Sequence, residues 1–408
     1  MLNFIDGGVC AAQGFRAAGI HVGVKTHAEW KKDVALIVSD VDCAAAAVFT
    51  KNVVKAAPIR VDLQHLADGK ARAVIANSGN ANACAPEGEE NAERMCAAAA
   101  KAIGCKPEDV LVSSTGVIGQ RINVEAIEAG VPALYAALER SAEASDAAGH
   151  AIMTTDLAKK EAAVETTVGG RTVRMGGIAK GSGMIHPNMG TMLCFLTTDC
   201  AISPEMIKAA LLETVQVSFN RISVDGDTST NDTCCVLANG LAGNTPITAK
   251  GPDYDAFVEA LKALCTELAK RMASDGEGAR HLITCNISGA KTEQSAETIA
   301  KSVISSTLTK AAIFGADANW GRVLCAMGYS GEDFDPDRVT VHFASAAGSI
   351  QVCAKGRGLD FDEDLAKKIL TEHDVEINIA MEEGDAACTC WGCDITYDYI
   401  KINGDYRT

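Results

Sequence analysis

The feature that most constrains the fold is the alternation, along the whole chain, of short strand-like runs with longer helical stretches. Residues 91–103 and 124–139 have helical character, and apolar residues recur at helical spacing from Phe257 to Met272. The pair Gly169-Gly170 is typical of a two-residue hairpin turn. Helices mixed with hairpins predict an α/β (mixed α+β) protein whose sheets are covered by helices. Strands are expected at residues 34–38, 45–50, 73–77, 110–114, 163–168, 172–175, 192–198, 282–288, 339–343 and 349–354.

Composition limits the classes of partner. The chain of 408 residues carries 53 acidic and 37 basic side chains, for a formal net charge of −16. A negative field of this size disfavours binding to nucleic acid. No apolar run approaches the ~20 residues of a membrane-spanning helix, and the amino terminus lacks the pattern of a secretory signal. We therefore expect a cytoplasmic protein that binds neither nucleic acid nor membrane.

Sixteen cysteines would suit a disulfide-rich secreted protein, but the chain is long and shows no secretory context. We expect most of them to be small buried hydrophobic residues. The one cluster contains Cys388, Cys390 and Cys393. On a strand the first two share a face and the third points the other way, and no further ligand pair completes a zinc site. No metal is expected, and an interaction protein built on this cluster is kept as an alternative.

Near the middle of the chain a threonine directly follows a glycine and precedes a strand-like segment. The run begins at Lys180, continues Gly-Ser-Gly-Met-Ile-His-Pro-Asn-Met, and ends at Gly190 and Thr191. A hydroxyl placed there can attack the preceding carbonyl, which glycine leaves unshielded, and cut its own chain. The amino group so released would then act as the base for the threonine. Self-cleavage would give an α chain of residues 1–190 and a β chain of residues 191–408.

Three charged residues are candidates for roles around this threonine. Lys180 precedes its glycines, the wrong order for a phosphate-binding loop, and suits a substrate carboxylate instead. Glu277 lies between two glycines that let its carboxylate approach an ammonium group. His186 is an alternative base for Thr191, although a loop histidine is more often satisfied by local partners, and the terminal amine is preferred.

A further polar turn, Ser113-Ser-Thr115-Gly116, follows a predicted strand. A hydroxyl and a backbone N–H in such a turn can bind one oxygen, as an oxyanion hole requires. The alternative is a simple turn that caps the next helix.

The segment of residues 218–232 contains Asp225-Gly-Asp227 and resembles the start of a calcium loop. Thr230 stands where such a loop needs glycine, and Val236 stands where it needs glutamate. We therefore interpret the segment as a polar turn that supports a site.

Together these motifs resemble those of the ornithine acetyltransferases, the bifunctional glutamate N-acetyltransferases of arginine biosynthesis. The resemblance covers essentially the whole chain and implies a mixed α/β fold of the N-terminal-nucleophile type. Its most specific motif is Lys180-Gly-Ser-Gly-Met-Ile-x-Pro-Asn-Met-x-Thr-Met-Leu193. The other matching segments are residues 77–82, 114–119, 153–156, 218–221, 225–232, 274–278, 317–322 and 403–408.

This resemblance implies roles for individual residues. Thr191 would be the nucleophile, freed by cleavage after Gly190, and Thr115 with Gly116 would form the oxyanion hole. An acetyl group would pass from N2-acetyl-L-ornithine to Thr191 as an ester, ornithine would leave, and L-glutamate would become N-acetylglutamate. The amino-acid substrate would be held by Thr154, Lys180, Thr191, Glu277, Asn403 and Thr408.

The resemblance also implies an assembly of two α and two β chains and an enzyme that requires no cofactor. Whether acetyl-CoA serves as a second acetyl donor is left open by the sequence. A related self-processing amidohydrolase or aminopeptidase, which would deliver the acyl group to water, is the alternative function. The chain departs from the commonest family pattern at His186 and Gly190, where alanine is usual, and at Arg280-His281, where Thr-Lys is usual.

Overall fold

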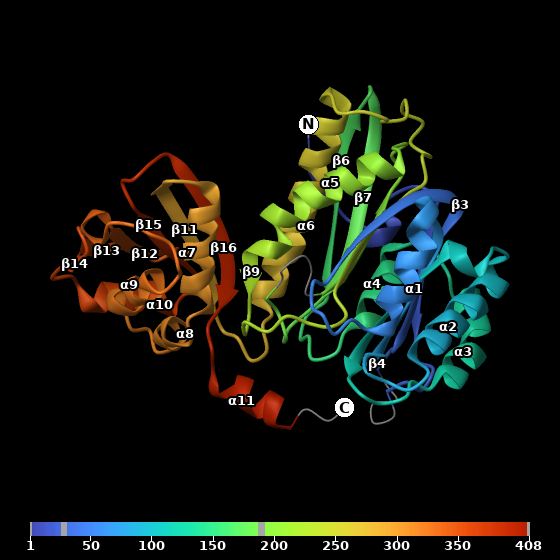
Figure 1. Cartoon of the computed structure of the whole chain (residues 1–408), viewed down its shortest axis with the longest axis horizontal. Helices are drawn as coiled ribbons and strands as arrows, with labels where there is room; N and C mark the ends of the chain where they lie inside the picture. The colour runs from blue at the N-terminus through green and yellow to red at the C-terminus, as the bar shows by residue number, and fades with distance from the viewer. Residues whose placement is uncertain (1, 26–30, 187–191, 406–408) are drawn as a thin grey trace.

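The computed structural model describes residues 2–25, 31–186 and 192–405. Two sheets with packed helices form two lobes (Figure 1). The larger lobe is built on a nine-stranded sheet, and the smaller lobe, at the left of the figure, on a seven-stranded sheet. The mixed α/β architecture predicted from the sequence is confirmed.

The nine-stranded sheet follows the order β1-β6-β7-β8-β10-β3-β4-β5, with β2 beside β3. Strand β7 pairs antiparallel with β8, and β8 pairs parallel with β10. Strands that precede and follow residue 190 are therefore interleaved in one sheet. The strands are β1 (Asn3–Ile5), β2 (Phe15–Ile20), β3 (Val34–Phe49), β4 (Lys70–Asn80), β5 (Val110–Val117), β6 (Lys160–Val168), β7 (Arg171–Lys180), β8 (Leu193–Thr198) and β10 (Thr233–Ala238).

Helices cover both faces of this sheet because successive side chains of a strand point to opposite sides. Helix α4 packs on one face, with Ala144 and Ala148 in the same apolar cluster as Phe195. On the other face, α2 and α3 cover one end and α5 and α6 cover the other. The helices of this lobe are α1 (Ala57–His65), α2 (Gly88–Ile103), α3 (Val124–Ala136), α4 (Ala142–Ile152), α5 (Pro204–Val217) and α6 (Pro252–Ser274), with short 3-10 turns η1 (Gly8–Cys10), η2 (Leu66–Asp68), η3 (Pro107–Asp109) and η4 (Phe219–Arg221).

The smaller lobe uses most of the chain after α6. Its sheet follows the order β14-β13-β12-β15-β11-β16-β9, so one short strand from before α6 completes it. Helix α11 extends from this lobe beneath the larger one (Figure 1). The elements are β9 (Ile222–Ser223), β11 (Leu282–Ala290), α7 (Glu293–Ser305), α8 (Thr307–Phe314), α9 (Trp320–Gly328), η5 (Pro336–Arg338), β12 (Thr340–Ser345), β13 (Gly348–Ala354), β14 (Arg357–Gly358), α10 (Glu363–Thr371), β15 (Asp374–Ala380), β16 (Ala386–Cys393) and α11 (Tyr397–Gly404).

Most of the predicted elements are confirmed, with differences at their ends. Residues 34–38 and 45–50 fall largely in one strand, β3, whose pairing with β4 shifts register between them. Gly169 and Gly170 have φ angles of +56° and +75° and form the expected hairpin turn between β6 and β7.

The longest described helix, α6, has 23 residues and carries charged side chains along its length. None of the described helices combines the length and the apolar character that crossing a bilayer requires.

Candidate active site

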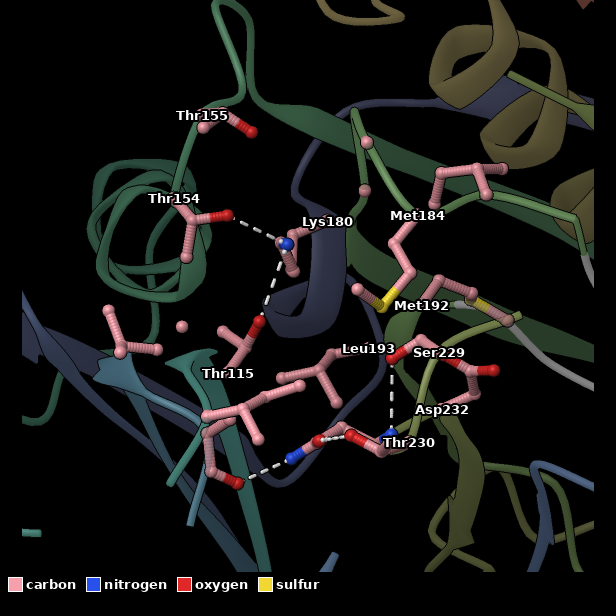
Figure 2. Close-up of a pocket in the computed structure, with 18 of the residues that line it drawn as sticks. Thr115, Thr154, Thr155, Lys180, Met184, Met192, Leu193, Ser229, Thr230 and Asp232 are labelled. Atoms are coloured by element: carbon pink, nitrogen blue, oxygen red, sulfur yellow. Dashed lines mark hydrogen bonds between the residues drawn. The ribbon is translucent and has the colours of Figure 1, made fainter. Parts of the chain in front are cut away.

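A cavity of about 360 Å³ lies where strand ends of the larger sheet meet the turn after α6 (Figure 2). The ends of β5 and β7 and the start of β8 contribute to its wall, and α11 reaches it from the smaller lobe. Most of the site residues predicted from the sequence meet there although they are far apart in the chain. Those that line the cavity are Thr115, Gly116, Thr154, Lys180, Glu277 and Asn403.

The predicted cleavage position adjoins this cavity along the chain. Gly190 and Thr191, like Thr408, lie outside the described residues, so their roles stay predictions. Met192, which directly follows Thr191, lines the cavity together with Leu193, the first residue of β8. The described start of the predicted β chain is therefore at the cavity.

Thr115 and Gly116 lie near the end of strand β5 (Val110–Val117), at the cavity wall. The backbone of Gly116 has φ +134°, and a Cβ atom there would lie 2.3 Å from the carbonyl carbon of Gly79 on β4. Only glycine allows this close approach of two strands. Asn123, not Thr115, caps the following helix α3, so the alternative of a capping turn is not supported.

Lys180 extends from the end of β7 into the cavity and is almost fully buried. Its Nζ donates hydrogen bonds to Thr154 Oγ1 at 2.9 Å and to Thr115 Oγ1 at 3.4 Å, as Figure 2 shows. Burial lowers the pKa of Lys180, and the carboxylate of Asp156, 3.8 Å from Nζ, acts in the opposite direction. An ammonium group held by two hydroxyls is well placed to receive a substrate carboxylate.

Behind Lys180 lies a buried network of charges. Asp156 pairs with Lys160 at 2.6 Å, and Lys160 also pairs with Asp275 at 2.5 Å. Asp156 accepts a further hydrogen bond from the N–H of Gly181. Burial alone would raise the pKa of Asp156, but the ammonium groups of Lys180 and Lys160 outweigh it and hold that pKa well below its usual range. The network fixes a negative charge beside the cavity lysine.

Glu277 lies in the turn after α6 and is 6% exposed. Its Oε2 accepts a hydrogen bond from Asn403 Nδ2 at 2.7 Å. A Cβ atom on Gly183 would lie 2.3 Å from the Glu277 carboxylate, so the glycine-rich segment before Met184 makes room for it. Gly278 has φ +69°, and its carbonyl accepts a hydrogen bond from Thr396 at 2.7 Å. The glycines therefore bring the carboxylate to the cavity, as the sequence predicts.

The polar loop before β10 braces the segment that leads to the predicted cleavage position. Asp225 accepts hydrogen bonds from the N–H groups of Met184 at 2.6 Å and Ile185 at 2.9 Å. The hydroxyl of Thr228 donates to the carbonyl of His186 at 2.9 Å. The interpretation of this loop as a supporting turn is confirmed by these contacts.

His186 makes a local hydrogen bond, between Nδ1 and Ser223 Oγ at 3.0 Å. Burial, with the charge of Lys301, lowers the pKa of His186 to about 4. The ring is therefore neutral at pH 7 and has a structural partner. This arrangement favours the terminal amine over His186 as the base for Thr191.

Several polar residues of the site were not singled out in the sequence. Asp156 closes a Thr-Thr-Asp motif, and Lys160 follows four residues later, a spacing that allows the pair to form. Asn231 donates through Nδ2 to the carbonyls of Ala81 and Ser114, which ties the loop before β10 to β5, the strand that carries Thr115 and Gly116. Only the tertiary structure reveals these partners.

The cysteine cluster lies on β16, away from the cavity. Cys388 and Cys390 lie on one face with their sulfurs 3.9 Å apart, and Cys393 lies near the ammonium group of Lys310. Among the described residues no group of three or more histidine, cysteine, aspartate or glutamate side chains is arranged to hold a metal ion.

Arg280 and His281, which differ from the commonest family pattern, lie beside the cavity and do not line it. The Nδ1 atom of His281 lies 2.9 Å from the carboxylate of buried Asp394. The guanidinium of Arg280 lies over the ring of Phe314, 5.5 Å from its centre. Both residues anchor the strand that follows the Glu277 turn.

Comparison with known proteins identifies the family of this chain. The model of the ArgJ family matches residues 16–408. The arginine biosynthesis bifunctional protein ArgJ of Symbiobacterium thermophilum is 50% identical over 408 residues, which is 100% of both chains. The crystal structure of the ArgJ protein of Bacillus halodurans is 42% identical with a TM-score of 0.50, and the match covers 52% of this chain and 98% of that one. The crystal structure of ornithine acetyltransferase from Mycobacterium tuberculosis, complexed with ornithine, is 39% identical with a TM-score of 0.43. The match covers 46% of this chain and 100% of that one. The chain belongs to the ArgJ family.

Proposed function

We propose that this protein is an ornithine acetyltransferase of arginine biosynthesis, which transfers the acetyl group of N2-acetyl-L-ornithine to L-glutamate. The observation that carries the proposal is the single cavity that gathers an oxyanion pair, a buried cation and a buried anion at the start of β8. Membership of a family whose curated relatives are named for arginine biosynthesis supports it.

In the first half-reaction, the hydroxyl of Thr191 attacks the acetyl carbonyl carbon, and its proton passes to the free α-amine of the same residue. The carbonyl oxygen becomes negative and accepts hydrogen bonds from the Thr115 hydroxyl and the Gly116 N–H. The bond between the acetyl carbon and the ornithine nitrogen then breaks. Ornithine takes the proton from the α-amine and leaves an acetyl ester on Thr191.

The second half-reaction reverses these steps with a new amine. The α-amine of glutamate attacks the ester carbon, and the oxygen of Thr191 leaves with the proton that glutamate gives up. The same oxyanion pair stabilises both tetrahedral intermediates. Because an amide is exchanged for an amide through an ester, the scheme uses only groups of the chain and requires no cofactor.

The charged wall of the cavity would hold the amino-acid part of the substrate. Lys180 suits the α-carboxylate, because its ammonium is already oriented by Thr154. Glu277 suits the δ-ammonium of ornithine. Asn403 holds Glu277 in place, and Thr408 would complete the set.

We also propose that the chain cleaves itself after Gly190 and assembles as two α and two β chains. The Bacillus halodurans chain is matched over 98% of its length by 52% of this chain, as expected if the solved chain is one of two cleavage products. A cytoplasmic location also stays a prediction.

The test is the Thr191→Ala variant compared with the native chain. A denaturing gel of the native protein should show two bands of roughly 20 and 23 kDa, because 42.5 kDa over 408 residues is about 0.1 kDa per residue. The variant should give one full-length band and no acetyl transfer. A variant that retains transfer would exclude Thr191 as the nucleophile.

A second assay separates the transferase from a hydrolase. The protein is incubated with N2-acetyl-L-ornithine, with and without glutamate. The transferase should release ornithine in step with N-acetylglutamate, whereas steady ornithine release with free acetate and no glutamate would support the amidohydrolase. Acetyl-CoA as the sole donor to glutamate tests whether the protein also uses that second donor.

A further inference from the structure

Lys25 does not line the cavity, but its side chain reaches the backbone that carries Thr154. It lies in a partly buried loop after β2, and its Nζ donates hydrogen bonds to the carbonyls of Met153 at 2.8 Å and Lys32 at 3.1 Å. Met153 follows α4 as its C-cap, in an extended conformation, and directly precedes Thr154. The last carbonyls of a helix have no partner within it, so a cation placed here satisfies one of them.

The main chain of Lys25 is held in place by the buried carboxylate of Asp33. That carboxylate accepts hydrogen bonds from the successive N–H groups of residues 22–25, at 2.7 to 3.1 Å. The stem of the Lys25 side chain then passes Gly79 on β4, where a Cβ atom would lie 2.9 Å from the Lys25 Cγ. Gly79 therefore leaves room for a lysine side chain that extends to the end of α4.

One peptide group links Lys25 to the cavity. The carbonyl that Lys25 binds and the N–H of Thr154 belong to the same planar peptide unit. The N–H donates to Asp156 Oδ2 at 3.0 Å, so a cation holds one end of the unit and an anion holds the other. The hydroxyl of Thr154 in turn accepts the hydrogen bond from Lys180 at 2.9 Å, as Figure 2 shows. Rotation of this peptide unit would displace the hydroxyl that orients the cavity lysine.

We propose that Lys25 is a positioning residue for the amino-acid substrate. By holding the carbonyl of Met153 it fixes Thr154, and Thr154 sets the direction in which the ammonium of Lys180 meets the substrate carboxylate. Lys25 acts through these groups and does not touch the substrate itself. The inference rests on the proposed function, because it requires that Lys180 binds the carboxylate of N2-acetyl-L-ornithine.

The charge of Lys25 is lost at mildly alkaline pH, which gives this role a signature. Burial lowers the pKa of Lys25 to about 8, and the charges of Lys31 and Lys180 act in the same direction. The carboxylates of Asp33 and Asp156 act in the opposite direction. Below this pKa the ammonium makes a charge-assisted hydrogen bond to its carbonyl partner, and above it the neutral amine makes a weaker one. The advantage of lysine at this position should therefore be present below the pKa and should decline above it.

The test compares Lys25→Met with the native protein by steady-state kinetics of N-acetylglutamate formation from N2-acetyl-L-ornithine and glutamate. At pH 7 the substitution should raise KM for N2-acetyl-L-ornithine roughly 10-fold, with a smaller change in kcat. A variant that merely folded less well would show a lower apparent kcat and an unchanged KM. Lys32→Met is the matched control, because it removes the same charge from an exposed side chain of the same loop and should keep the native KM.

The pH dependence separates the charge of Lys25 from the packing of its side chain. The ratio of KM in Lys25→Met to KM in the native protein should be largest at pH 7. It should fall toward unity at pH 9, because the native side chain has then lost its charge. Taking the ratio removes the titration of groups that both proteins share, the amine of the substrate included.

The outcomes are distinct. A native KM in Lys25→Met, or a KM ratio that stays the same from pH 7 to pH 9, would overturn the role of Lys25 while leaving the transferase intact. Absence of acetyl transfer in the native protein would overturn the proposed function itself.

Discussion

Asn403 donates a hydrogen bond to the carboxylate of Glu277 at 2.7 Å, which joins the last helix of the chain to the turn after α6. The same amide nitrogen donates to the carbonyl of Tyr399, and Thr396 at the start of the helix bonds the carbonyl of Gly278. Helix α11 has no buried residue of its own. Its contacts with the Glu277 turn therefore link the described end of α11 to the cavity.

Asn403→Ala should weaken substrate binding more than catalysis. A hydrogen bond to a charged group contributes about 1.5–3 kcal/mol, so KM for N2-acetyl-L-ornithine should rise roughly 10- to 100-fold with a smaller change in kcat. Steady-state kinetics measure this split. Ile400→Ala, an exposed position on the same helix, should leave KM at its native value. A variant Asn403→Ala with native KM would show that Glu277 is held without it.

Lys160→Met should destabilise the fold and misplace Lys180. The substitution removes the ammonium that pairs directly with both Asp156 and Asp275. Breaking a buried ion pair by removing one partner costs about 3–5 kcal/mol. Denaturant unfolding measures the loss. Lys159→Met is the matched control, because that side chain is only partly buried and its ion pairs near the surface contribute about 1 kcal/mol or less. Equal losses in the two variants would contradict the buried network.

The unfolding free energy should fall at acidic pH partly because of His186. Its pKa is about 4 in the folded chain and about 6.5 when unfolded, so below pH 6.5 the unfolded chain binds the extra proton. The contribution of neutral His186 to the free energy of unfolding is complete above pH 6.5, and it is lost as the pH falls from 6.5 through 4. Discounted for partial exposure, it amounts to about 2 kcal/mol or less. In His186→Asn the decline between pH 6.5 and 4 should be smaller, as urea unfolding at several pH values would show.

Gly116→Ala should abolish acetyl transfer. The new Cβ atom would meet the carbonyl carbon of Gly79 at 2.3 Å, so β5 must shift away from β4 at Thr115 and Gly116, the proposed oxyanion pair. Gly119→Ala separates this clash from backbone strain, because Gly119 also has positive φ but no atom within 4 Å of its Cβ position. Strain of that kind costs about 1–3 kcal/mol and should lower Tm without loss of transfer. Equal activity in both variants would contradict the role of Gly116.

The sequence predicted which residues line the cavity better than it predicted the contacts between them. Lys180, Glu277 and Thr115 could be predicted because a charge or hydroxyl beside glycines after a strand or helix is visible in the chain itself. Lys160 and Asn231 were not, because their significance comes from partners brought near by sheet pairing. In the smaller lobe, β15 alternates buried Val375, Ile377 and Ile379 with more exposed residues, a period-2 pattern that was missed in the sequence although it was present.

The order of the larger sheet has a consequence for what a cut chain can do. Strands β8 and β10 lie between β7 on one side and β3 on the other, so a break after residue 190 would leave two ladders of backbone hydrogen bonds across the cut. Each piece would hold only part of the sheet, and neither could pair its edges without the other. The two products should therefore migrate together under native conditions, part only in denaturant, and refold efficiently only when mixed.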